Sequence, residues 1–117
     1  MTQAGDIYVF PLPAEPSSLR IVSRSAVLAQ LGLARDPRPL GVALRRIAIR
    51  KGTRFRTIEA CDARLSQGFH AFDPTTDFRW TDGDADIPSA LFAGFTGKLE
   101  FVLDVAMTSR YGDDRAA

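Results

Sequence analysis

The residues best suited to chemistry lie between Gly68 and Pro88, a stretch that holds the only tryptophan and the only histidine of the chain. Three phenylalanines lie near Trp80 in this stretch, and closely spaced aspartates follow it. An aromatic ring beside directional hydrogen-bonding groups suits a sugar or another flat ligand. The candidate ligand-binding residues are therefore Trp80, His70, Arg79 and Asp82.

The same aromatic residues also fit a purely structural role. In a strand over 78–81, Phe78 and Trp80 point to one face and Arg79 and Thr81 to the other. Trp80 would then anchor the core of a β-domain. Buried aromatics are commoner in such domains than sugar-binding platforms, so we favour this interpretation from the sequence alone. A lone histidine such as His70 is likewise more often structural than catalytic.

Three aspartates at alternate positions resemble the start of a calcium-binding loop. They are Asp82, Asp84 and Asp86. The rest of that pattern fails, because Ile87 stands where the loop requires glycine and Ala93 where it requires a bidentate glutamate. We therefore expect a turn in which aspartate side chains accept hydrogen bonds from nearby backbone amides, and no metal site.

The sequence offers few residues suited to catalysis. Cys61 is the only cysteine, which excludes an internal disulfide and a cysteine-based zinc site. It has no histidine at close spacing, so a buried structural cysteine is expected. There is no glycine-rich phosphate loop, and no cofactor is predicted. We expect a protein that is not an enzyme, with a small hydrolase based on aspartates and His70 as the least favoured alternative.

Basic residues are concentrated in one short segment. Six of the twelve residues from 45 to 56 are cationic, namely Arg45, Arg46, Arg50, Lys51, Arg54 and Arg56. A surface for phosphate or acidic glycans is one interpretation. We favour another, in which this segment pairs with the acidic segment 73–86 inside the fold or across a dimer. Nucleic acid is not an expected partner, because the net charge is only +1 and few aromatics are interleaved.

The length of 117 residues suits one domain, residues 1–117, with an extended segment over 1–18 and a flexible tail over 112–117. No apolar run approaches the ~20 residues that span a bilayer, and the start of the chain lacks the features of a secretory signal. The expected location is therefore the cytoplasm, or the cell surface if the chain is part of an exported protein.

Alternating apolar residues predict most of the secondary structure. Leu99, Phe101, Leu103, Val105 and Met107 share one face of a strand over 98–108. A hairpin is expected over 42–58, with Phe55 inward and a β-bulge at Arg45-Arg46, because the apolar residues change parity there. Further strands are expected over 7–10, 19–24, 69–72 and 78–81, with an irregular segment over 87–97. Residues 25–34 favour either two turns of helix or an irregular loop.

These elements predict an all-β fold, an antiparallel β-sandwich of jelly-roll type with at most one short helix. A half-barrel with a single helix packed across it is the alternative.

Five segments in the same order resemble a β-sandwich module of bacterial proteins, found beside Hint (hedgehog/intein-type) domains and, in related form, beside glycosyltransferases. They are residues 19–25 (LRIVSRS), 36–44 (DPRPLGVAL), 68–70 (GFH), 79–85 (RWTDGDA) and 87–88 (IP). The resemblance implies an accessory domain linked to glycan or cell-surface biology, without self-splicing. An acidic residue often follows the glycine-aromatic-histidine element of that family, and Asp73 is the nearest match here.

The expected function is thus a non-catalytic accessory or binding module, with a carbohydrate as the favoured ligand. The alternative is a structural or self-association domain that binds a partner, such as a second copy, through a sheet edge or face.

Overall fold

The computed structural model describes residues 1–23, 26–27 and 39–108. Within these ranges the chain forms short strands and one 3-10 helix, Ser89–Phe92. The strands are β1 (Thr2–Ala4), β2 (Ile7–Leu12), β3 (Leu19–Val22), β4 (Ala26–Val27), β5 (Pro39–Leu40), β6 (Val42–Lys51), β7 (Arg54–Glu59), β8 (Arg79–Trp80), β9 (Asp84–Ile87) and β10 (Leu99–Thr108).

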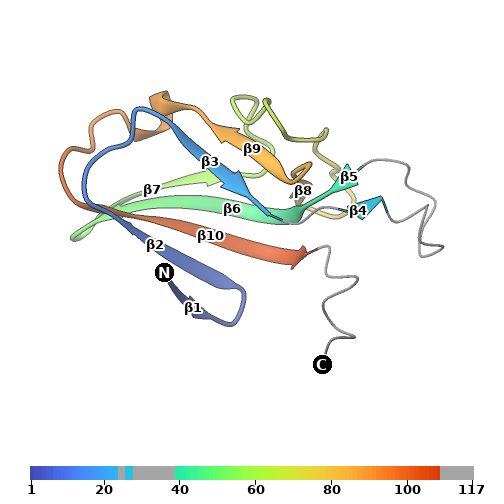
Figure 1. Cartoon of the computed structure of the whole chain (residues 1–117), viewed down its shortest axis with the longest axis horizontal. Coiled ribbons are helices and arrows are strands. Elements are labelled where there is room, and N and C mark those ends of the chain that lie inside the picture. Colours follow the sequence, from blue (N-terminus) through green and yellow to red (C-terminus); the bar gives the residue numbers. More distant parts are fainter. Residues whose placement is uncertain (24–25, 28–38, 109–117) are drawn as a thin grey trace.

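The strands form one large antiparallel sheet and two smaller pairs. The large sheet has the order β1-β2-β10-β6-β7, and β8 pairs with the beginning of β6. Strands β3 and β9 form a separate antiparallel pair that lies over one face of the large sheet (Figure 1), and β4 pairs with β5. The predicted all-β class is confirmed. The jelly-roll topology stays a prediction, since the second layer holds only two strands in the part of the chain that the structure describes.

The hydrophobic core lies between the large sheet and the β3–β9 pair. Ile47 and Ile49 of β6 and Phe101 of β10 face Ile21 of β3 and Ile87 of β9 in one buried cluster. The 3-10 helix adds two further buried side chains to it. Burial of each large aliphatic side chain contributes roughly 1.5–3 kcal/mol, so this cluster fixes how the two layers sit on each other.

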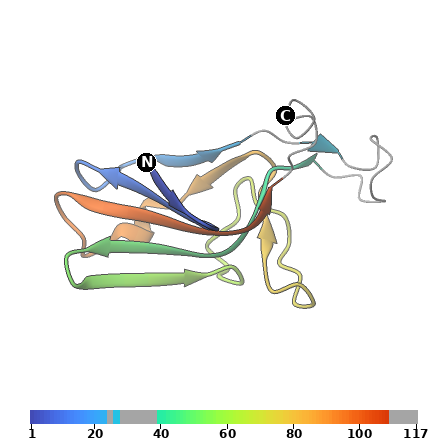
Figure 2. The ribbon, with the colours of Figure 1, turned by 90° about the horizontal axis from the view of Figure 1, so that it is seen from below.

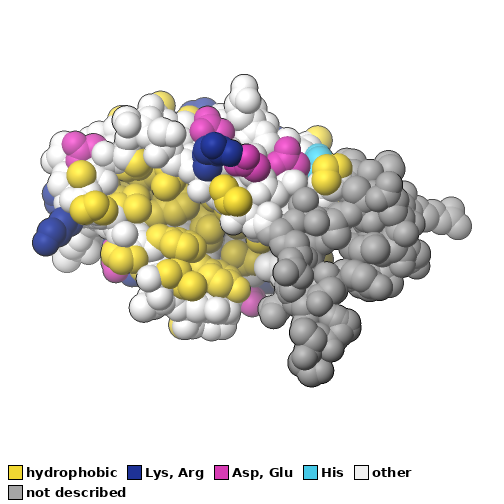
Figure 3. Space-filling view, viewed as in Figure 1, with side chains coloured by type: hydrophobic (Ala, Val, Ile, Leu, Met, Phe, Trp, Pro, Cys, Tyr) yellow, Lys and Arg dark blue, Asp and Glu magenta, His cyan; other side chains and the backbone are white. Residues whose placement is uncertain are grey.

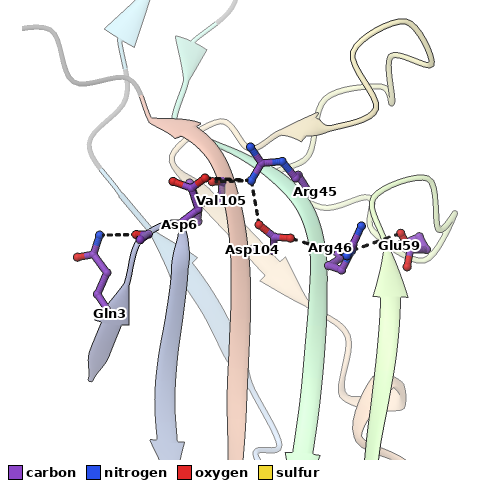
Figure 4. Close-up of polar contacts among 8 residues, drawn as sticks. Gln3, Asp6, Arg45, Arg46, Glu59, Asp104 and Val105 are labelled. Carbon is purple, nitrogen blue, oxygen red and sulfur yellow. Dashed lines mark hydrogen bonds and ion pairs between the residues drawn. The ribbon is translucent and has the colours of Figure 1, made fainter.

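The hairpin over 42–58 and its bulge are confirmed. Arg46 pairs with Asp104 and Leu44 with Val105, which leaves Arg45 as the extra residue in β6. The bulge lets Leu44 and Ile47 face the core together. It also turns Arg45 across β10, where its guanidinium bonds Asp104 at 2.9 Å and the Val105 carbonyl at 3.2 Å (Figure 4).

Two predicted side-chain orientations are wrong. Phe55 points outward with 71% of its surface exposed, because Ile58 of the same strand is buried and sets the opposite parity for the core face. Met107 is 48% exposed although it continues the alternation of β10. A second register shift, between Val105 and Met107, takes it out of the buried set.

The N-terminal segment is more regular than expected. It begins with β1, turns at Gly5 and runs through Pro11 to the end of β2. The Val105 amide donates to the Asp6 carbonyl, so alternate residues of β2 from Asp6 onward bond β10 and Pro11 does not. The Pro11 nitrogen therefore faces the other side of β2, beyond the end of β1, where its missing hydrogen costs no ladder bond.

Other predictions of local structure have mixed outcomes. Ala26–Val27 forms a strand rather than part of a helix, and the rest of the segment 25–34 lies outside the described residues, as does the tail 112–117. The expected strand over 69–72 is reduced to single bridges at Phe69 and Asp73. The strand β9 was not predicted. In the described ranges, no helix is long and apolar enough to cross a membrane.

Candidate ligand site around Trp80

Trp80 lies between two other parts of the chain, strand β6 and the segment 68–70. Strand β8 pairs with the beginning of β6, where Trp80 lies opposite Ala43. On its other side, the His70 amide donates to the Trp80 carbonyl at 2.9 Å, and the Asp82 amide donates to the Gly68 carbonyl at 2.9 Å. These backbone bonds fix Trp80 on a regular element, where its side chain is partly exposed and lies outside the core cluster. The interpretation of Trp80 as a core anchor is therefore wrong.

Gly68 allows the segment 67–70 to lie close against β9. Its φ is +82°, and a Cβ built there would lie 2.2 Å from the Asp84 carbonyl oxygen. Any side chain at this position would push the segment away from β9. The glycine therefore secures the backbone that carries His70 to the neighbourhood of Trp80.

A pocket of about 410 Å³ opens beside Trp80. The loop that forms its far wall projects from the sheet next to β8 (Figure 2). The lining residues are Ala71, Phe72, Asp73, Pro74, Thr76, Phe78 and Trp80. Phe78 meets Trp80 edge to face, with ring centroids 6.2 Å apart. The pocket therefore combines aromatic surface with a few polar groups and has no basic side chain in its lining.

The wall formed by residues 73–77 is a self-bonded turn. The Asp73 carboxylate accepts from the Thr75 amide at 2.9 Å and from the Thr75 hydroxyl at 2.6 Å. The Thr76 hydroxyl donates to the Asp73 carbonyl at 3.2 Å. Asp77 closes the turn with a φ of +68°, a conformation that aspartate tolerates better than most residues. These bonds pre-organise the side of the pocket that faces the aromatic rings.

Arg79 points away from the pocket and donates hydrogen bonds to backbone carbonyls of neighbouring segments. Its Nε donates to the His70 carbonyl at 2.7 Å. Its Nη1 donates to the carbonyls of Ala60 and Asp62, at 3.2 and 2.9 Å. One guanidinium thereby joins the end of the β6–β7 hairpin to the segment before the pocket.

His70 and Asp82 also make local structural bonds. The Nε2 atom of His70 lies 2.7 Å from the Pro39 carbonyl oxygen, and because a carbonyl only accepts, this nitrogen carries a hydrogen. The Asp82 carboxylate accepts from the Asp84 amide at 2.9 Å, as the turn interpretation of this segment requires. Of the four sequence-predicted site residues, only Trp80 lines the pocket; His70 and Arg79 support the backbone around it.

The three alternating aspartates do not converge. Asp84 and Asp86 lie on β9 with exposed side chains, while Ala85 and Ile87 between them are buried. Among the residues that the structure describes, no three His, Cys, Asp or Glu side chains are grouped to hold a metal ion. Asp84 instead pairs with Arg20 on β3, whose Nε donates at 2.8 Å. The hydrogen bond from Arg20 lowers the pKa of Asp84.

The basic hairpin does not pair with the segment 73–86 as expected. Arg45 and Arg46 make ion pairs with Asp6 in the turn between β1 and β2, with Glu59 of β7 and with Asp104 of β10 (Figure 4). Arg50 makes an ion pair with Glu100 of β10. Arg54, Arg56 and Lys51 donate to backbone carbonyls of the segment 91–96. Arg54 and Arg56 also lie over the Phe95 ring, at 4.8 and 5.0 Å from its centroid. The cluster therefore anchors the loop that follows the 3-10 helix.

Cys61 is exposed, which corrects the expectation of a buried thiol. It follows the buried Ala60 at the end of the hairpin, where the chain leaves β7 and turns outward. A smaller pocket of about 180 Å³ lies there, lined in part by Arg45, Arg46 and Cys61.

Comparison with protein-family models, with curated proteins and with solved structures found no match for this chain. The resemblance to modules beside Hint domains and glycosyltransferases accordingly stays a prediction.

The residues that complete the pocket were only partly visible in the sequence. Phe72 and Phe78 belong to the aromatic set around Trp80, whereas Pro74 and Thr76 lie in what looked like a plain connecting loop. The one available signal was the run Asp-Pro-Thr-Thr-Asp between two aromatic segments, which predicts a tight turn and so brings the flanking aromatics together.

Proposed function

We propose that this protein is a non-catalytic binding module whose Trp80 pocket accepts a neutral carbohydrate. The observation that carries the proposal is the pocket itself, which is lined by Phe72, Phe78 and Trp80 together with Thr76 of the 73–77 turn. A pyranose ring has one apolar face and a rim of hydroxyl groups. Such a ligand matches an aromatic surface bordered by hydroxyl and carbonyl oxygens.

The electrostatics of the pocket support a neutral ligand over an anionic one. Among the described residues that line the pocket, none is a lysine or an arginine. A phosphate or an acidic glycan would therefore find no basic side chain among them with which to pair. The Thr76 hydroxyl, which donates to the Asp73 carbonyl, retains lone pairs that accept from a ligand hydroxyl.

The hydrogen bonds of the neighbouring residues support a non-catalytic role. His70 directs its Nε2 hydrogen to Pro39, and Arg79 directs its guanidinium to three carbonyls. Neither faces the pocket with a group that transfers a proton. The sequence resemblance to accessory modules of glycan-related bacterial proteins points to the same kind of role.

The proposal is tested by fluorescence, because Trp80 is the only tryptophan. Neutral mono- and oligosaccharides selected on a glycan array are titrated against the protein while the emission is followed. We expect a saturable change for at least one sugar. Phe78→Ala keeps the fluorophore but removes one wall, and should weaken binding by about tenfold, as expected for loss of ~1.4 kcal/mol of ring contact.

The matched control is Phe55→Ala, which removes an exposed phenylalanine on the outer face of the hairpin. It should leave the titration unchanged. Absence of any response across the panel, or equal weakening by both substitutions, contradicts the proposal. Association with another polypeptide is the second candidate function, and a different surface favours it.

A further inference from the structure

One side of the two-layered fold is open. Between β3 of the small sheet and strands β2 and β10 of the large sheet lies a cleft of about 290 Å³. Phe10, Leu12, Phe101 and Leu103 form its floor, and Leu19 and Ile21 belong to the β3 wall. Figure 3 shows apolar side chains gathered over this part of the surface. In this cleft Phe101 and Leu103 are buried, whereas Phe10 and Leu12 of β2 are only partly buried.

The β3 wall also presents an unused strand edge. Strands β3 and β9 are antiparallel, and the Ser23 amide donates to the Gly83 carbonyl. Because hydrogen-bonded residues alternate along such a ladder, Leu19 and Ile21 bond β9 while the N–H and C=O groups of Arg20 and Val22 point to the opposite edge. In the part of the chain that the structure describes, no backbone group pairs with them there.

The edge of β9 that faces away from β3 differs, because the segment 67–68 covers it. The Asp86 amide donates to the Gln67 carbonyl, and just before the strand the Asp82 amide donates to the Gly68 carbonyl. The small sheet thus has a protected edge at β9 and a bare one at β3, next to the apolar cleft. A bare edge beside an apolar groove is the arrangement that takes up an added strand.

We propose that this cleft binds an extended segment of another polypeptide, which adds to β3 as a third strand of the small sheet. Its backbone pairs with Arg20 and Val22. Alternate side chains of the segment enter the cleft and pack on Phe10, Leu12, Phe101 and Leu103. The occupant is therefore a strand with apolar, uncharged residues at every second position.

Charge and size both favour this occupant. Among the described residues that line the cleft, Arg20 is the only charged one, and its guanidinium is bonded to Asp84. None of these residues is therefore free to neutralise a charged side chain. Eight residues line the cleft, whereas a stable dimer uses roughly 20–30 residues a side. The site matches a short segment rather than a folded surface.

A second copy of the chain fits less well. Of the edge strands at the two sides of the large sheet, β1 is Thr-Gln-Ala, and the inward set of β7 includes Arg54 and Arg56. Neither supplies alternate apolar residues. Pairing of β3 with β3 of another copy would keep Leu19 and Ile21 in their own core and leave the floor of the cleft uncovered.

The test uses an end-capped eight-residue peptide of alternating valine and threonine, and amide hydrogen exchange followed by NMR. Binding should slow the exchange of the Arg20 and Val22 amides at least tenfold. A peptide methylated on alternate backbone nitrogens, and one with serine in place of valine, should both bind at least tenfold more weakly.

Val22→Pro removes one hydrogen-bond donor from the bare edge and costs no bond to β9. We expect it to weaken peptide binding about tenfold. The control Val22→Thr changes the same side chain, which is 72% exposed, and keeps the amide. Circular dichroism and thermal melting establish that both variants are folded.

Three results overturn the proposal. The first is no binding of the valine–threonine peptide at millimolar concentration. The second is equal binding by wild type, Val22→Pro and the methylated peptide. The third is protection of Arg20 and Val22 that rises with protein concentration in the absence of peptide, which assigns the edge to a second copy instead.

Discussion

Arg56 shows how a single basic side chain fastens two elements together. Its Nη1 donates to the Leu91 carbonyl at 2.9 Å and to the Ala93 carbonyl at 2.7 Å, and its guanidinium lies over Phe95. The carbonyls at the end of a short helix lack partners within it, so an arginine from β7 satisfies them. In the sequence, this arginine belongs to an apparent ligand-binding cluster.

Replacing Arg56 with methionine should lower the free energy of unfolding by about 1–3 kcal/mol, because two hydrogen bonds from a charged donor are lost while the stem is retained. Urea denaturation measures the change. Arg50→Met is the control, since its exposed ion pair with Glu100 is expected to contribute only about 0–1 kcal/mol. Equal losses in the two variants would show that Arg56 is an ordinary surface residue.

Gly68 matters for two separate reasons, its backbone angle and its contact with β9. Gly5 has a positive φ as well, +60°, but a Cβ there would meet nothing within 4 Å. Alanine substitutions at Gly5 and Gly68 therefore separate the free-energy cost of a positive φ from the free-energy cost of the steric clash.

Gly5→Ala should destabilise the protein by about 1–2 kcal/mol, the cost of an L residue in the left-handed region. Gly68→Ala should cost about 3 kcal/mol or more, because the added methyl also displaces the Asp84 carbonyl. Thermal and urea unfolding of both variants provide the comparison. A similar cost at both positions would mean that the segment 67–70 yields without strain.

At the scale of elements, β3 and β9 are joined by a cross-strand ion pair in addition to their ladder. Arg20 bonds Asp84, and this hydrogen bond lowers the pKa of the carboxyl below its ordinary value. A carboxyl with a lower pKa in the folded state stabilises the fold at pH values above its unfolded pKa, roughly 4. That contribution is lost as the pH falls through the folded-state value.

Asp84→Asn should therefore reduce stability near neutral pH and have little effect at strongly acid pH. The measurement is urea denaturation of wild type and variant between about pH 2 and pH 7. Arg20→Gln should give the same pH profile, and the double variant should lose no more than either single one, because all three remove one interaction. A constant difference at every pH would exclude the ion pair as the cause.

On the scale of the whole molecule, the two layers have different tasks. The large sheet supplies the long strands β6 and β10, which contribute seven of the fifteen buried residues of the core cluster. The small sheet is short and covers only part of that face, and the segments around it provide both proposed sites. The Trp80 pocket lies beside β8, which pairs with the beginning of β6. The apolar cleft lies along the bare edge of β3.

The two proposed sites are independent in their residues. The pocket is lined by seven residues of the segment 71–80, and the cleft by residues of β2, β3 and β10. The Phe78→Ala and Val22→Pro substitutions should consequently affect only their own ligands.

The features that depend on neighbouring residues follow from the amino-acid order alone. Strict alternation set the extent of β10, and the change of apolar parity at Arg45-Arg46 set the bulge. The same reasoning correctly predicted the hairpin and the hydrogen bond from the Asp84 amide to the Asp82 side chain, although not the strand that begins at Asp84. Each of these follows from the period of two in a strand or from a side chain that bonds an amide two residues away.

Only the tertiary structure decided which face of β7 is buried, that residues 84–87 form a strand and where the Trp80 pocket and the β3 cleft open. Alternation shows that a strand has two faces. The packing of Ile58 of β7 and Ile87 of β9 into the core cluster decides which face of each strand is buried. Strand β9 exists because β3, more than sixty residues earlier, supplies its hydrogen bonds. Pockets arise where such distant segments fail to cover one another, and that depends on the packing of the whole chain.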